Sequence, residues 1–208
     1  MWPIFGFEFA KLSTIGLVND NHKCKFAHQR PLLRRGGGAH FRCLIPAAPA
    51  LALTQQEIDR CVGKKVTPDL QINGCTAAIQ SEGVSVSDLA VAYHNRGLAY
   101  AKRGDLKDAI ADFDQAIRLN PQSARPYNDR GITYARQGNF NLAFADFDRA
   151  IRLDPTYVLA FRNRGFTYYA RREYDRAIAD YDVVIWLDPK NIAAYNDRGN
   201  IYHVKGGR

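Results

Sequence analysis

The stretch that decides the fold is Tyr93–Tyr100, with the sequence YHNRGLAY, because three later stretches nearly repeat it. The copies read YNDRGITY, FRNRGFTY and YNDRGNIY, at Tyr127–Tyr134, Phe161–Tyr168 and Tyr195–Tyr202. One glycine recurs every 34 residues in the four stretches, at Gly97, Gly131, Gly165 and Gly199. A fixed period of about 20–50 residues is typical of stacked supersecondary units, and a period of about 34 is typical of helix–turn–helix units.

Each unit has the apolar pattern of two helices. In the first unit, Tyr93, Gly97 and Tyr100 recur at spacings of four and three, which places them on one helix face. A break follows at Gly104. A second helical stripe then runs through Leu106, Ala109, Ile110, Phe113, Ala116 and Ile117. The stripe ends before Pro121, because proline disfavours helical angles in the residue that precedes it.

The 34-residue period, the glycine column and the Asn-Pro or Asp-Pro endings at Pro121, Pro155 and Pro189 resemble the tetratricopeptide-repeat family. Within that family, the chain resembles bacterial exported repeat proteins. The resemblance implies an all-α, right-handed superhelical solenoid of helix–turn–helix units. We assign three complete units to residues 90–123, 124–157 and 158–191, and a partial fourth unit or capping helix to residues 192–208. Residues 53–88 are assigned to a degenerate leading helix pair with a linker, and residues 1–52 to a leader.

The leading pair is indicated by helix-start signals. Thr54 followed by Glu57 matches a capping box. Pro68 suits the first turn of a second helix, since proline needs no amide partner there. The linker is expected at residues 85–87, with Asp88 as the N-cap of the helix that follows.

The leader has the layout of a secretory signal in part. Basic residues precede a short apolar run from Cys43, and Ala50 to Ala52 would suit cleavage after Ala52. The run is short and contains two prolines, and it begins far from residue 1, which fits an upstream start-site extension. The hypothesis is therefore an exported or periplasmic protein, and the alternative is a cytoplasmic protein with a disordered tail.

Cysteine placement bears on the same question. Cys24 and Cys43 precede the predicted cleavage, which leaves Cys61 and Cys75 as a pair. An even number of cysteines in an exported product favours a disulfide, and two buried free thiols are the alternative. Zinc is not expected, because no second Cys or His pair at ligand spacing accompanies them.

The charge distribution argues against a nucleic-acid partner. The formal net charge is +8, but residues 1–52 hold seven Lys/Arg against two Asp/Glu. The remaining residues hold 22 basic and 19 acidic side chains, so the repeats are nearly balanced and show no dedicated phosphate-binding face. No apolar run reaches the ~18 residues of a transmembrane helix. We expect a monomer or weak self-association.

No set of residues predicts catalysis. His94 and His203 lack a nucleophile at a spacing that implies a triad. The Asp-x-Asp pairs Asp112/Asp114, Asp146/Asp148 and Asp180/Asp182 do not converge, because helical residues two apart face different directions. The prediction is a protein that is not an enzyme and that has no cofactor or metal site.

A structural use is predicted for the charged columns. Arginine precedes the glycine in every unit, at Arg96, Arg130, Arg164 and Arg198. The second helices carry Asp112, Asp146 and Asp180. We expect these groups to pair across the helix packing, within a unit or between neighbours, because a guanidinium can hold a carboxylate through two hydrogen bonds.

By the resemblance, a partner binds the concave face made by the first helices of the units. The family pattern places on this face His94, Asn95, Lys102, Arg125, Asn128, Asp129, Arg136, Arg162, Asn163, Phe166, Tyr169, Asn196 and Asn200. Asparagines suit the backbone of an extended peptide, and arginines suit acidic groups. Family members that clamp a chaperone C-terminal carboxylate use lysine, asparagine and arginine at positions held here by His94, Leu98, Asp129, Leu159 and Asn163. A chaperone-tail receptor is therefore not expected.

The expected function is a non-catalytic scaffold of the bacterial envelope that binds a protein or peptide partner. The alternative is a docking segment or fragment of a larger cytosolic repeat protein or enzyme. RNA binding is a third and less favoured hypothesis, which predicts a steep dependence of affinity on salt.

Overall fold

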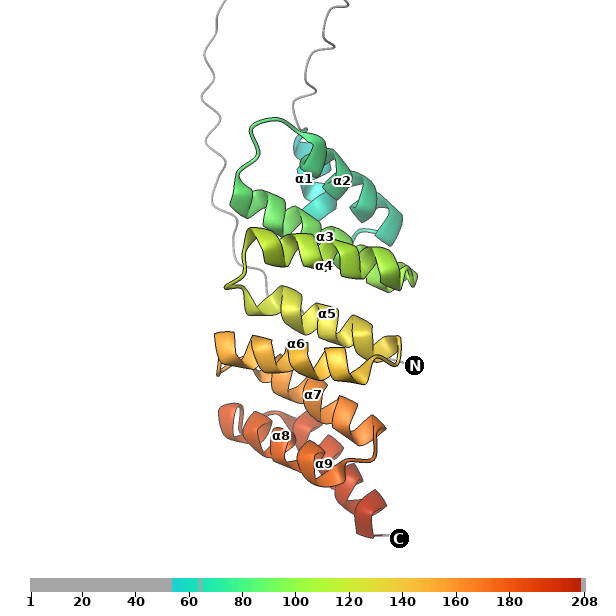
Figure 1. Ribbon diagram of the computed structural model, residues 1–208, viewed down its shortest axis with the longest axis vertical. Coiled ribbons are helices and arrows are strands. Elements are labelled where there is room, and N and C mark those ends of the chain that lie inside the picture. Colours follow the sequence, from blue (N-terminus) through green and yellow to red (C-terminus); the bar gives the residue numbers. More distant parts are fainter. Residues whose placement is uncertain (1–53, 64, 207–208) are drawn as a thin grey trace, which may run out of the picture. The chain divides into compact units, whose positions relative to one another are not determined.

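The computed structural model describes residues 54–63 and 65–206 (Figure 1). These residues lie within one compact unit, Pro46–Arg208. The described residues form nine α-helices, namely α1 Gln55–Val62, α2 Pro68–Gln80, α3 Val86–Arg103, α4 Leu106–Leu119, α5 Ala124–Arg136, α6 Phe140–Leu153, α7 Val158–Ala170, α8 Tyr174–Leu187 and α9 Ile192–Gly206. The predictions for residues 1–52, including the signal cleavage, fall outside the described ranges.

The helices pack as consecutive pairs. Helix α1 packs on α2, α3 on α4, α5 on α6 and α7 on α8 (Figure 1). The pairs stack through α2 on α3, α4 on α5, α6 on α7 and α8 on α9, and the first helices α3, α5 and α7 also contact one another in sequence. The predicted all-α fold of stacked helix–turn–helix units is confirmed.

The helix starts follow local hydrogen bonding. Thr54 and Glu57 form the predicted capping box at α1, and Pro68 is in the first turn of α2. The prediction of Asp88 as N-cap is wrong. Ser85 caps α3 instead, with its hydroxyl accepting from the Asp88 amide at 3.1 Å and donating to the Asp88 carboxylate at 2.6 Å. The helix therefore begins inside the expected linker, at Val86.

One column at the turn within each unit has a left-handed backbone. Gly104 has φ 100° and Gly138 has φ 80°. Arg172 occupies the same place in the third unit, with φ 63°. A left-handed residue with a Cβ costs roughly 1–2 kcal/mol relative to glycine, so the third unit contains local strain that the first two avoid.

The core of each pair depends on a close helix approach. Ala109, Ala143 and Ala177 are fully buried on the second helices. A Cβ built on Gly131 would lie 2.8 Å from a ring carbon of Phe147. Glycine is required there because the aromatic ring of the second helix fills the space that a side chain would need, and Gly97 has the same relation to Phe113.

Candidate functional site

Three arginines of the repeated stretch bind a carboxylate of their own unit. Arg96 donates through Nε and Nη2 to Asp112, at 2.7 and 2.8 Å. Arg130 and Arg164 make the same two bonds, to Asp146 and Asp180 respectively, at 2.6–2.9 Å. The structure thus brings the predicted arginines and aspartates together, in the two-bond geometry that makes such pairs strong.

The second aspartate of each Asp-x-Asp pair binds the arginine of the following unit. Arg130 donates from Nη1 to Asp114, and Arg164 from Nη1 to Asp148 at 2.5 Å. Arg198 donates to Asp182. The two aspartates of each pair therefore point in different directions and bind different arginines. The first binds the arginine of its own unit, and the second binds the arginine of the next unit. We call this set of contacts the arginine–aspartate ladder.

From the sequence alone, Asp114, Asp148 and Asp182 had no predicted partner. A usable signal was present: each lies 16 residues before an arginine of the column, and Asp112, Asp146 and Asp180 lie 16 residues after one. Arg96 has no such aspartate before it and bonds instead to Thr76 of α2, at 3.1 Å.

Aromatic rings complete the surroundings of the ladder. The Arg130 guanidinium carbon lies 5.7 Å from the ring centre of Tyr127 and 5.8 Å from that of Tyr134. Burial lowers the pKa of Arg130, but the hydrogen bonds and charges of Asp146 and Asp114 raise it by more, so its pKa lies above the ordinary arginine value. The inner carboxylates of the ladder, Asp112, Asp146 and Asp180, are buried and fully engaged with arginine, which suits a structural role.

A second set of polar contacts joins neighbouring first helices, between residues 35 apart. His94 Nε2 lies 2.7 Å from Asp129 Oδ2, and Asn163 donates to Asn128 Oδ1 at 2.9 Å. Arg136 donates to the Ala101 carbonyl at 2.7 Å. Arg162 and Asp197 form a longer ion pair, at 3.7 Å. We call these contacts the first-helix seam.

The seam corrects part of the predicted binding surface. Asn95, Asn128 and Asp129 were expected to face a ligand, but their side chains are 3%, 2% and 6% exposed. Asn128 and Asp129 hydrogen-bond to each other and to residues of the neighbouring first helices, so their polar groups are not available to a partner. The Asn95 amide nitrogen is the one buried side-chain polar atom without a hydrogen-bond partner among the described residues.

The other predicted residues remain accessible. His94, Arg162, Asn163 and Tyr169 are half-buried. The exposed members are Lys102, Arg125, Arg136, Phe166, Asn196 and Asn200. We call these ten residues the first-helix face. The exposed charged residues on it, Lys102, Arg125 and Arg136, are all positive.

The two cysteines of the leading pair form a disulfide. Cys61 of α1 and Cys75 of α2 are bonded, with their Cα atoms 4.5 Å apart, and both are buried. They pack with Ala78 and Ala92, so the bond lies inside the small core that joins the leading pair to α3.

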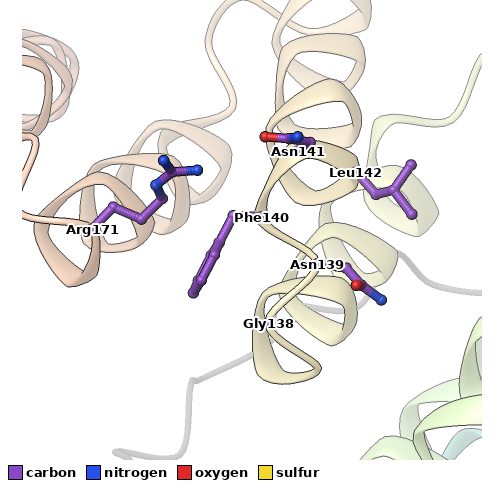
Figure 2. A pocket seen from close by; sticks show the side chains of 6 residues that line it. All are labelled: Gly138, Asn139, Phe140, Asn141, Leu142 and Arg171. Atoms are coloured by element: carbon purple, nitrogen blue, oxygen red, sulfur yellow. The ribbon is translucent and has the colours of Figure 1, made fainter.

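Surface depressions lie at two turns of the described repeats. One lies at the turn between α5 and α6, lined by Gly138, Asn139, Phe140, Asn141, Leu142 and Arg171 (Figure 2). The Arg171 guanidinium and the Phe140 ring face each other across it, at 5.7 Å (Figure 2). In residues 54–63 and 65–206, no group of three or more His, Cys, Asp or Glu side chains is placed to hold a metal ion. None of the helices in these ranges combines the length and apolarity needed to cross a membrane.

Comparison with known proteins places the repeats in a family. A family model described as TPR repeat matches residues 97–138 and 167–206, and one described as tetratricopeptide repeat matches residues 124–157. A search of curated protein sequences found no match.

Several solved structures are similar. The first TPR domain of Spaghetti (RPAP3), bound to an HSP90 peptide, is 27% identical, with a TM-score of 0.55 over 58% of this chain and 95% of that domain. The second TPR domain of human RPAP3, in complex with an HSP70 peptide, is 25% identical, with a TM-score of 0.53 over 57% and 98%. MamA is 25% identical, with a TM-score of 0.61 over 75% and 87%. Together with the stacked helix pairs, these matches identify the repeated helix pairs of residues 97–206 as tetratricopeptide repeats.

Proposed function

We propose that the first-helix face binds an extended acidic segment of a partner protein, and that the chain is a non-catalytic scaffold. The observation that carries the proposal is the charge of this face. Its exposed ions are Lys102 of α3 and Arg125 and Arg136 of α5, whereas Asp129 of α5 and Asp197 of α9 are already paired, with His94 and Arg162 respectively. An acidic segment would meet positive groups without competing carboxylates.

Aromatic groups add a second element of recognition. Phe166 is exposed on α7, and its ring centre lies 6.5 Å from that of the half-buried Tyr169. Such a pair offers apolar contact area beside the cations, which suits a segment that alternates acidic and apolar side chains.

The similar structures support peptide binding as the mode. TPR modules are typically non-catalytic binding domains, and two of the similar domains hold the peptides SRMEEVD and SGPTIEEVD. Here, however, Leu98 and Leu159 stand where the family resemblance implies clamp residues, and Asp129 is buried beside His94. The proposed partner is therefore an internal acidic segment rather than a chaperone tail.

The test compares a variant that lacks three positive charges of the first-helix face with a control variant that lacks two positive charges elsewhere on the surface. Binding of a fluorescein-labelled acidic peptide, Ac-DEFDEFDEFD, would be measured by fluorescence anisotropy beside its Asn/Gln counterpart. We expect binding of the acidic peptide alone, and a loss of at least tenfold in Lys102→Ala/Arg125→Ala/Arg136→Ala. The control Arg118→Ala/Arg152→Ala removes exposed arginines from the second helices α4 and α6 and should bind as the parent does.

Two results would contradict the proposal. One is an equal loss of affinity in the control, which would indicate a nonspecific charge effect. The other is tighter binding of a single-stranded RNA than of the acidic peptide, with a steep salt dependence that the triple variant abolishes, which would favour RNA binding.

We also propose export to an oxidising compartment. The support is the disulfide between Cys61 and Cys75, since such bonds persist outside the cytosol. The cytosolic alternative, a docking segment of a larger protein, predicts two free thiols in the cell. Alkylation of thiols in intact cells followed by mass spectrometry separates the two, and N-terminal sequencing would show whether the chain is cleaved after Ala52.

A further inference from the structure

Helix α9 has the face of a first helix but no second helix packed on it within the described residues. In α3, α5 and α7, the glycine of the column faces an aromatic residue of the following helix. A Cβ on Gly97 or Gly131 would lie 2.8 Å from a phenylalanine ring, and one on Gly165 would lie 3.1 Å from Asp180. A Cβ on Gly199 would meet nothing within 4 Å.

Arg198, which precedes Gly199, makes only one of the two kinds of carboxylate contact seen in the ladder. Arg130 and Arg164 bind one carboxylate through Nε and Nη2 and a second through Nη1. Arg198 has its Nη1 contact with Asp182, but no carboxylate among residues 54–63 and 65–206 bonds to its Nε or Nη2. The edge of its guanidinium that would hold a carboxylate through two bonds is therefore open.

The aromatic positions of the same face are also uncovered. Tyr195 and Tyr202 are 43% and 54% exposed, whereas Phe161, at the position of Tyr195 in the previous unit, is 9% exposed. Tyr195, Arg198, Gly199 and Tyr202 recur at helical spacing and form one continuous face. We call this set the α9 face. It is distinct from the first-helix face, whose α9 members are Asn196 and Asn200.

The three helices that cover the equivalent faces share one pattern. Each has an alanine, an aspartate three residues later and an aromatic residue directly after it, as in Ala109/Asp112/Phe113, Ala143/Asp146/Phe147 and Ala177/Asp180/Tyr181. The alanine permits close approach, the aspartate bonds to the arginine, and the aromatic ring fills the space above the glycine. The α9 face lacks all three of these contributions.

We propose that the α9 face binds an amphipathic helix of a partner protein that carries the pattern Ala-x-x-Asp-aromatic. The charge of Arg198 requires the acidic residue, and the absent Cβ of Gly199 requires the aromatic one. A second copy of this chain does not supply such a helix without unfolding, because Ala109, Ala143 and Ala177 are fully buried in their own units.

The first experiment uses a peptide with the chain's own pattern. The acetylated and amidated peptide of residues 139–155 contains Ala143, Asp146 and Phe147. We expect it to bind the full-length protein in isothermal titration, with affinity falling about tenfold when the peptide carries Asp146→Asn or the protein carries Arg198→Gln. Combining the two changes should weaken binding no further, because both remove the same contact.

A covalent version does not depend on the low helicity of a free peptide. Residues 141–155 appended directly to Arg208 would place an aspartate at position 214, which is 16 residues after Arg198, as in the three complete units. The appended helix should raise the thermal midpoint by several degrees and block the free peptide. The gain should disappear with Asn at position 214 or with Gly199→Leu, which fills the face.

Three outcomes would overturn the proposal. One is equal binding of the peptide to Arg198→Gln. Another is an appended helix that leaves the thermal midpoint unchanged. The third is a concentration-dependent dimer, seen by sedimentation, that Arg198→Gln abolishes and the peptide does not, which would make a second copy the occupant. The Lys102→Ala/Arg125→Ala/Arg136→Ala protein should still bind the helix peptide, so a failure of the proposed function is separable from a failure here.

Discussion

The arginine–aspartate ladder and the first-helix face lie on the same repeats, but the ladder is repeated from unit to unit and the first-helix face is not. The ladder is the same in successive units, with Arg130 and Arg164 making equivalent contacts. The column of first-helix positions that contributes to the first-helix face is less uniform: it holds His94, Asn128, Arg162 and Asn196 in successive units. Units that stack on one another need the same packing contacts at each junction. Recognition of a partner has no such need, so the varied positions are where specificity can reside.

Depth separates the varied positions further. The second member of that column, Asn128, is buried in the first-helix seam, whereas Asn196 is exposed. Variation therefore marks two kinds of residue, those that adjust the junction between two first helices and those that contact a partner. Burial distinguishes them, and the following predictions test the distinction.

The largest effect is expected at the buried end of the ladder. Asp146→Ala leaves Arg130 half-buried with only the exposed Asp114 as a carboxylate partner, and should lower the free energy of unfolding by about 3 kcal/mol. Asp114→Ala should lower it by less than about 1 kcal/mol, because Asp114 is 43% exposed and Asp146 is 8% exposed. Urea denaturation followed by circular dichroism measures both. Equal losses would show that the two carboxylates are energetically equivalent.

Alanine substitutions in the glycine column should change the stability in opposite directions at Gly131 and at Gly199. Gly131→Ala forces a methyl group against the Phe147 ring, at 2.8 Å, and should destabilise by about 1–2 kcal/mol. Gly199→Ala meets nothing within 4 Å and should stabilise by up to about 1 kcal/mol, through better helix propensity. The two thermal midpoints, measured side by side, check the signs. Destabilisation at both positions would mean that the α9 face is covered in solution.

Two substitutions in the turn column should change the stability by similar amounts in opposite directions. Arg172→Gly should stabilise by about 1 kcal/mol, because it relieves a left-handed backbone at φ 63°. Gly138→Ala, at the equivalent turn, should destabilise by about the same amount. Thermal melts of the two single variants suffice. A loss of stability in Arg172→Gly would indicate that the Arg172 side chain makes contacts worth more than the strain.

The smallest effect on stability is expected on the first-helix face. Lys102→Ala and Arg125→Ala should each change the free energy of unfolding by less than about 0.5 kcal/mol, since both side chains are exposed. The same changes should weaken binding of the acidic peptide. A loss of more than about 1 kcal/mol in stability would show that these residues stabilise the fold rather than serve as a binding surface.

The sequence predicted the repeat and its ladder for a definite reason. A helix pair that stacks on copies of itself presents the same apolar and ionic requirements every 34 residues, so these requirements appear as columns. The ladder's second carboxylate was missed because its partner lies in the next unit, and local helix geometry shows only that Asp112 and Asp114 diverge. The start of α3 was misplaced because both Ser85 and Asp88 suit an N-cap, and only the hydrogen bonds distinguish them.

By itself, the sequence determined the fold class, the period and the arginine column, because each depends on residue type and spacing within the repeated unit. The tertiary structure alone decided which polar residues of the first helices are buried and which are free to meet a partner. That depends on how each first helix packs against its neighbours, which buries Asn95, Asn128 and Asp129 and leaves Arg125 and Asn196 exposed.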